Sequence, residues 1–147
     1  MSGRPSVAET MLSVAQTFAH RSTCPRREVG CVLVDVEDKI LSVAFNGPPS
    51  GWDHCTDLPC PGADLPSGEG LGLCQAIHAE INAIDQCSDI TRIVSAYITT
   101  EPCIECTKAL LKTSCHNIYY LDDYSKSGRA LWVTRSSWDK LKVCARS

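Results

Sequence analysis

The chain has 147 residues, with 14 basic and 17 acidic side chains, 44% hydrophobic residues and 21% charged residues. This length fits a single domain, residues 1–147, with a full hydrophobic core, and the composition excludes intrinsic disorder. The net charge of −3 argues against a nucleic acid polymer as partner, because such a partner requires a basic surface. No apolar run is long enough to cross a membrane and the first residues lack the character of a signal peptide, so we expect a cytoplasmic protein with no membrane partner.

The hydrophobic pattern predicts helices and strands that alternate along the chain. Val7, Met11, Val14 and Phe18 recur at helical spacing and predict an amphipathic helix. The remaining predicted elements are a buried strand at 29–36, its hairpin partner at 40–45, a helix at 73–87, a strand at 93–100, a helix at 103–111, a strand at 117–121, a short helix at 128–138 and a strand at 141–145. This order favours a largely parallel sheet covered by helices on both faces, with the first hairpin as its antiparallel part.

A long loop at residues 46–73 interrupts this pattern. It contains five of the eight prolines and six of the nine glycines, and neither the helical nor the strand period continues through it. A loop of this length inside a compact domain is uncommon unless it is functional or is held by something other than packing. We therefore expect an additional anchor in this region.

Cysteines supply a candidate for that anchor. The chain has ten cysteines and no export signal, so metal ligands or core residues are expected rather than disulfides. Cys24, Cys55, Cys60 and Cys74 lie inside or beside the loop, and four thiolates can form a closed structural zinc site. His54 is an alternative to Cys60 or Cys74, and four unpaired thiols or adventitious disulfides are the alternative to this second zinc. Four further cysteines lie on apolar strands or beside helices, and we expect them to be small core residues: Cys31, Cys87, Cys115 and Cys144.

Two short motifs indicate catalytic metal chemistry. A C-x-x-C pair such as Cys103 and Cys106 is expected by chance in a chain with ten cysteines, but its combination with a preceding proline and a His78-Ala79-Glu80 motif is not. A catalytic zinc takes three protein ligands, here His78, Cys103 and Cys106, and acidifies water in its open position. Glu80 is two residues from the ligand His78, where its carboxylate can take a proton from the water and carry it to the substrate. The motifs predict a catalytic zinc site.

These residues resemble the cytidine/deoxycytidylate deaminase superfamily. His78-Ala79-Glu80 with Pro102-Cys103-x-x-Cys106 is similar to its zinc motifs, which match a His/Cys/Cys zinc with a non-ligand glutamate. The stretches that resemble deoxycytidylate (dCMP) deaminases within it are Ser22–Gly30, Phe45–Pro49, His54-Cys55, Pro66–Glu69 and Asn82. The resemblance implies a three-layer α/β/α sandwich with a mixed five-stranded sheet, the cytidine deaminase-like fold.

The same resemblance implies roles for several residues. Asn46 would bind the deoxyribose, and the backbone of Ala79 with the carboxylate of Glu80 would read the pyrimidine edge. Tyr124 matches a family tyrosine near the substrate, and Cys24 and Cys55 match ligand positions of a second zinc. Candidates for the phosphate contact are Arg26 and Arg27, for which the alternative is a pair of solvated surface side chains.

The reaction expected from the resemblance is hydrolysis of dCMP to dUMP and ammonia, which supplies thymidylate synthesis. The family also implies dCTP and dTTP, with Mg²⁺, as effectors around the Asn46-Gly47 loop, and a homo-oligomer, usually a hexamer. Ala44-Phe45 replaces the family's Gly-Tyr before this loop, and Asp89 stands where some phage members have an arginine. The alternatives are a deaminase of a modified cytosine nucleotide, of cytidine or of tRNA adenosine, and a non-catalytic zinc-binding domain, in which Glu80 would have no purpose.

Overall fold

The structure is a computed structural model that describes residues 3–22, 27–47 and 77–142. The sequence predictions for Cys24, Arg26, His54, Cys55, Cys60, Cys74 and Cys144 lie outside these residues. Its elements are α1 (Val7–Ala19), β1 (Gly30–Val34), β2 (Ile40–Phe45), α2 (Ala79–Gln86), η2 (Ile90–Arg92), β3 (Ser95–Thr100), α3 (Ile104–Leu111), β4 (Asn117–Asp122), η3 (Arg129–Leu131) and β5 (Ser137–Lys140). No helix within these ranges has the length and apolar character that a bilayer crossing requires.

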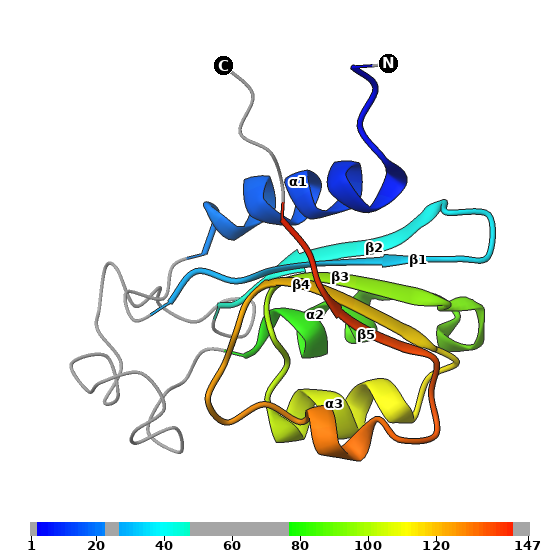
Figure 1. Cartoon of the computed structure of the whole chain (residues 1–147). Coiled ribbons are helices and arrows are strands. Elements are labelled where there is room, and N and C mark those ends of the chain that lie inside the picture. The colour runs from blue at the N-terminus through cyan, green and yellow to red at the C-terminus, as the bar shows by residue number, and fades with distance from the viewer. Residues whose placement is uncertain (1–2, 23–26, 48–76, 143–147) are drawn as a thin grey trace.

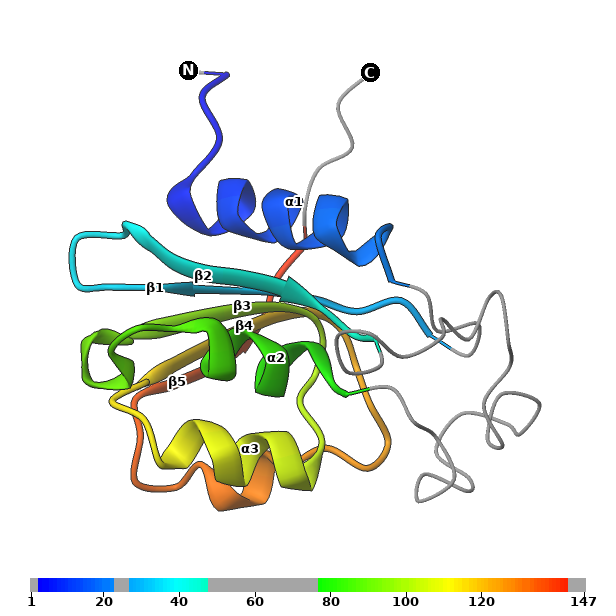
Figure 2. The same cartoon turned by 180° about the vertical axis from the view of Figure 1, so that it is seen from behind.

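The strands form one mixed five-stranded sheet in the order β2-β1-β3-β4-β5. β1 is antiparallel to both β2 and β3, whereas β3, β4 and β5 run parallel. Helix α1 covers one face of the sheet, and α2 and α3 cover the other (Figure 1), as the reverse view also shows (Figure 2). The predicted three-layer α/β/α fold with a mixed five-stranded sheet is confirmed.

Helix α1 begins with a capping box. The Ser6 hydroxyl accepts a hydrogen bond from the Glu9 backbone N–H, and the Glu9 carboxylate accepts one from the Ser6 backbone N–H. The helix turns Leu12, Ala15 and Ala19 toward the sheet. Small residues on this line let the helix approach closely: a side chain in place of Gly30 would collide with the carbonyl of Ala15.

The amphipathic helix is present, but two of the four apolar residues that predicted its buried face, the first and the last, are exposed. Val7 is 46% exposed and Phe18 is 37% exposed, whereas Met11 and Val14 pack beside the core. Alanines carry the contact instead, because their small side chains allow the backbone of α1 to lie close to β1.

Two hydrophobic clusters fill the spaces on either side of the sheet. Strand β1 is buried along its whole length, as its apolar run predicts, and its residues alternate between the clusters. Cys31 and Leu33 belong to the cluster under α2 and α3, and Val32 and Val34 to the cluster under α1. Cys31 and Cys115 are buried core residues as expected, while Cys87 is half-buried at the edge of the same cluster.

The C-terminal part differs from the prediction. The helix predicted at 128–138 is a three-residue 3₁₀ turn, η3, and the last strand lies at 137–140 instead of 141–145. Trp138 therefore lies on β5, in register with Ile118 of β4. Its ring packs against that of Trp132, with 5.7 Å between the ring centroids. Tertiary contacts outweigh local propensity here, since the Trp132 ring is buried in the core at 5% exposure.

Candidate zinc centre and active site

The three predicted ligands come from the starts of two helices on the same face of the sheet. His78 is the N-cap of α2, Cys103 is the N-cap of α3, and Cys106 lies in the first turn of α3. Pro102 precedes the cap and, with its fixed φ, suits the entry to a helix. Residues 25 positions apart in the chain are thus brought together because α2 and α3 lie next to one another.

The donor atoms of these three residues fit a zinc ion. His78 Nδ1 lies 3.1 Å from Cys106 Sγ and 3.5 Å from Cys103 Sγ, and all three donor atoms lie within 4.8 Å of one another. Tetrahedral bonds of about 2.3 Å to sulfur and about 2.0 Å to nitrogen place such donors roughly 3.5 Å apart. One imidazole and two sulfurs leave a fourth position for water or substrate, as in catalytic zinc sites.

Electrostatics in the centre favour a thiolate. A hydrogen bond from the Cys106 thiol, together with His78, lowers the pKa of Cys103 to about 4. The pKa of Cys106 is raised by its hydrogen bond to Cys103 and by burial, and the hydrogen bond with Cys103 raises the pKa of His78. The α3 backbone also contributes, since the Cys106 N–H lies 3.5 Å from Cys103 Sγ. A metal ion at this point would displace the remaining protons.

Glu80 lies in the first turn of α2, beside the ligands. Its side chain is buried, with 4% of the residue exposed, and burial raises the pKa of its carboxyl above the ordinary value. A raised pKa suits a group that takes and returns a proton near neutral pH. Glu80 lies in a pocket next to the candidate zinc ligands. The residues that line this pocket are Arg27, Val29, Asn46, His78, Ala79, Glu80, Thr100, Glu101 and Cys103.

Asn46 and Ala79, two of the predicted substrate-binding residues, both line this pocket. The Asn46 amide already holds the chain beside it: its Oδ1 accepts from Val29 N–H at 2.9 Å and its Nδ2 donates to the Arg27 carbonyl at 2.8 Å. An amide has two donor and two acceptor sites, so its bonds to the described residues use one of each. Ala79 is fully buried at the start of α2, with only its backbone available for recognition.

The Arg27 side chain at the pocket stacks on the Tyr124 ring. Arg27 lines the pocket, and its guanidinium carbon lies 4.7 Å from the centre of the Tyr124 ring. Tyr124 is not itself among the residues that line the pocket, and it contacts the lining residue Arg27. Cation–π stacking of this kind orders an arginine side chain.

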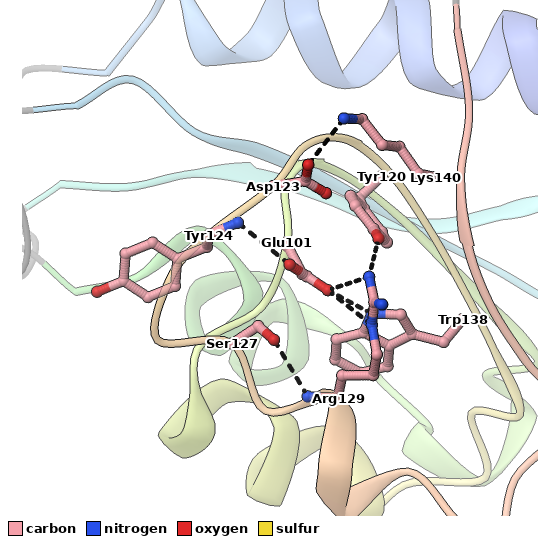
Figure 3. A network of polar contacts seen from close by, with 8 residues as sticks. All are labelled: Glu101, Tyr120, Asp123, Tyr124, Ser127, Arg129, Trp138 and Lys140. Atoms are coloured by element: carbon pink, nitrogen blue, oxygen red, sulfur yellow. Dashed lines mark hydrogen bonds and ion pairs between the residues drawn. The ribbon is translucent and has the colours of Figure 1, made fainter.

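Sequence reasoning missed Glu101, which lines the pocket beside Cys103. Its carboxylate is the centre of a polar network with Tyr124, Arg129 and Trp138 (Figure 3). Burial raises its pKa, but hydrogen bonds from Trp138 and Tyr124 and the Arg129 charge outweigh this effect and lower the pKa overall. The available signal was a charged residue between a buried strand and the proline of the cysteine motif.

Comparison with known proteins agrees with this geometry. Residues 5–122 match the model of the cytidine and deoxycytidylate deaminase zinc-binding region. ComE operon protein 2 of Bacillus subtilis is 34% identical over 124 residues, 82% of this chain and 62% of that protein. Deoxycytidylate deaminase of Mycobacterium phage D29 is 33% identical over 125 residues, 80% of this chain and 95% of that protein.

A solved structure is similar over nearly the whole chain. The crystal structure of dCMP deaminase from cyanophage S-TIM5 in complex with dCMP and dUMP matches with a TM-score of 0.76 and 25% identity, over 95% of this chain and all of that chain. The chain spans about half the length of several curated relatives, and 62% of the Bacillus protein. The match over residues 5–122 shows that the chain belongs to the family of the cytidine and deoxycytidylate deaminase zinc-binding region.

Proposed function

We propose that the chain catalyses zinc-dependent hydrolysis of dCMP to dUMP and ammonia, and so supplies dUMP for thymidylate synthesis. The observation that carries this proposal is a buried glutamate, Glu80, in one pocket with His78 and Cys103 of the zinc-binding group. The relatives named deoxycytidylate deaminase and the cyanophage enzyme with bound dCMP and dUMP support the choice of substrate.

The chemistry requires water to add at C4 of cytosine and the amino group to leave as ammonia. Zinc, when bound by His78, Cys103 and Cys106, is a Lewis acid that lowers the pKa of water. Glu80 takes a proton from the attacking water and delivers it to the pyrimidine ring nitrogen. It then takes the proton of the new C4 hydroxyl and delivers it to the amino group as the C4–N bond breaks, so one water is consumed for each ammonia released.

Recognition of the nucleotide would use the rest of the pocket. Asn46 would bind the deoxyribose, and the Ala79 backbone with Glu80 would read the pyrimidine edge; the presence of all three in one pocket supports these roles. Arg27, stacked on Tyr124, is a cation at the pocket wall that suits the substrate phosphate. Arg26, the preceding residue in the sequence, is the second candidate for this contact. This set would favour a nucleotide over free cytidine, because the nucleoside lacks the anion.

Loss of cytosine absorbance on incubation with dCMP tests the function directly. Glu80→Gln should lower kcat by about 10²- to 10⁴-fold, the usual contribution of a general acid–base group, while the zinc content stays unchanged. Asp85→Asn, an exposed acid-to-amide change on the same helix, is the matched control and should keep its rate. If the wild-type protein leaves dCMP unchanged but deaminates cytidine or a modified dCMP, that compound and not dCMP is the substrate. A zinc-loaded protein inactive on every cytosine compound would indicate a binding domain.

We further propose a second, structural zinc held by Cys24, Cys55, Cys60 and Cys74, with His54 as the alternative to one of the last two. The support is the chemistry of four cysteines, two inside the proline- and glycine-rich segment 46–73 and two in the sequence on either side of it. Metal analysis of the pure protein should give two zinc ions per chain, and Cys55→Ser should lower this to one and reduce thermal stability. One zinc per chain in the wild type, with no effect of Cys55→Ser, would refute this site.

Regulation and assembly complete the proposal. We propose a cytoplasmic homo-oligomer, a hexamer by resemblance, that responds to dCTP and dTTP with Mg²⁺. Rates measured against dCMP with and without each triphosphate test the regulation, and light scattering tests the assembly. Hyperbolic rates that neither triphosphate changes would mean that the Ala44-Phe45 variation accompanies loss of allosteric control.

A further inference from the structure

Glu101 is a buried carboxylate in the active-site pocket for which the proposed chemistry has no use. It is 4% exposed, and each of its oxygens has protein donors (Figure 3). Oε1 accepts from the Tyr124 backbone N–H at 3.1 Å. Oε2 accepts from Arg129 Nη2 at 2.9 Å, Arg129 Nε at 3.2 Å and Trp138 Nε1 at 2.7 Å. A carboxylate bonded this completely is a structural acceptor and not a mobile acid.

The first oxygen holds the turn that follows β4. Tyr124 sits in this turn, and its ring supports the Arg27 guanidinium at the pocket wall. The Glu101 N–H also donates to the Asp122 carbonyl at 2.8 Å, so Glu101 fixes both sides of the Asp122–Tyr124 segment. Movement of this turn would therefore move the Arg27 side chain.

The second oxygen ties the same turn to the C-terminal segment. Arg129 follows directly after Gly128, whose N–H donates to the Pro102 carbonyl at 2.9 Å next to the zinc ligand Cys103. Arg129 also bonds to the buried hydroxyl of Tyr120. A side chain at Gly128 would collide with Thr107 of α3, so this segment lies directly against the helix that carries the thiolates.

The far end of the segment is fixed as well. The Arg135 guanidinium donates to the carbonyls of Leu111, Thr113 and Cys115 at the C-terminal end of α3, at 2.6 to 3.3 Å. Residues 128–135 are thus bonded beside both ends of α3, which makes them a rigid support for the Glu101 carboxylate.

We propose that Glu101 is a positioning residue for substrate binding, which holds the Tyr124 turn, and through it Arg27, in place beside the zinc ligands. The inference rests on the deaminase function proposed above. It assigns Glu101 to the binding of the phosphate-bearing half of the nucleotide and leaves proton transfer to Glu80. The effect of Glu101 then passes through the Tyr124 ring.

Steady-state kinetics with dCMP on the zinc-loaded protein test this assignment. Glu101→Gln keeps the size of the side chain but turns one acceptor oxygen into a donor that faces another donor. We expect KM to rise about tenfold, equivalent to about 1.4 kcal/mol, with kcat changed less than threefold and zinc content unchanged. Asp123→Asn is the matched control: it removes the exposed ion pair to Lys140 on the same turn, and its KM should equal that of the wild type.

A double-mutant cycle separates positioning from general damage. Tyr124→Ala removes the ring but keeps the N–H that Glu101 accepts. If Glu101 acts through the ring, adding Glu101→Gln to Tyr124→Ala should raise KM by less than threefold further. A further tenfold rise in the double variant, or an unchanged KM in Glu101→Gln alone, would overturn the proposal. A collapse of kcat at constant KM would make Glu101 a catalytic residue instead. A wild type inactive on dCMP would overturn the proposed function and this role with it, whereas the outcomes above, in an active wild type, overturn this role alone.

Discussion

At the scale of single residues, the pocket contains two buried carboxylates with opposite surroundings. Glu80 has few partners to offset its burial, and its pKa is raised, whereas the donors around Glu101 lower the pKa of that carboxyl. Paired groups whose environments separate their pKa values commonly divide the work of an active site. Glu80 is suited to moving protons and Glu101 to holding the frame.

Asn46 is a residue whose structural role can be tested separately from its proposed contact to the sugar. Asn46→Asp replaces the amide donor by an oxygen that faces the Arg27 carbonyl, while the bond from Val29 N–H is kept. We expect the free energy of unfolding to fall by about 1–3 kcal/mol, measured by urea denaturation, because a buried acceptor is left unpaired. Asn117→Asp is the control, since the hydroxyl of its partner Ser95 can donate instead. Equal losses in both variants would contradict this reading.

At the scale of elements, the sequence was sufficient wherever periodicity or motif spacing is local. The run at 29–36 predicts β1 because a strand buried on both faces needs continuous apolar residues. The spacing of Cys103 and Cys106 predicts two sulfurs on one side of a helix start. The prediction for segment 128–138 was wrong because η3 and β5 depend on partners that are distant in the sequence. Trp138, for example, donates a hydrogen bond to Glu101. Glu101 was missed for the same reason: its donors come from three later segments.

The β1–β2 hairpin gives an element whose stability depends on pH. The Asp35 carboxylate accepts from the N–H groups of Lys39 at 3.0 Å and Glu37 at 2.9 Å and pairs with Arg92 at 3.1 Å. The hydrogen bond from Lys39 contributes most to lowering the pKa of Asp35. A folded-state pKa below the unfolded one means that the stabilisation is present above the unfolded value of about 3.9 and is lost as pH falls through the folded value.

Asp35→Asn should therefore be less stable than the wild type by a constant amount between about pH 5 and 8, and the difference should shrink below about pH 4. Chemical denaturation across this range measures it. Arg92→Met removes only the ion pair and leaves both backbone bonds, so it should remove a smaller part of the pH dependence. A difference between wild type and Asp35→Asn that does not change with pH would show that the charge of Asp35 contributes nothing.

At the scale of the whole molecule, the candidate metal ligands come from two helices that the chain connects through η2 and β3. Zinc bound by His78 from α2 and by Cys103 and Cys106 from α3 would favour the folded state, because the three donors converge only there. At a free zinc concentration 100 times Kd, the gain is about 2.7 kcal/mol, and in a chain of this size it raises Tm by roughly 5–10 °C.

Removing zinc with a chelator should accordingly lower Tm, measured by calorimetry, and readdition should restore it. The chelator-induced shift should be smaller in Cys106→Ser, which lacks one of the three donors, whereas Cys87→Ser, at the edge of the core, should respond as the wild type does. Any zinc held elsewhere in the chain contributes equally to all three proteins, so the difference between their shifts isolates the centre between α2 and α3. If metal binding at this centre stabilises the fold, the loss of one donor must reduce the chelator-induced shift in Tm. Identical Tm shifts in Cys106→Ser and the wild type would therefore show that this centre does not couple metal binding to folding.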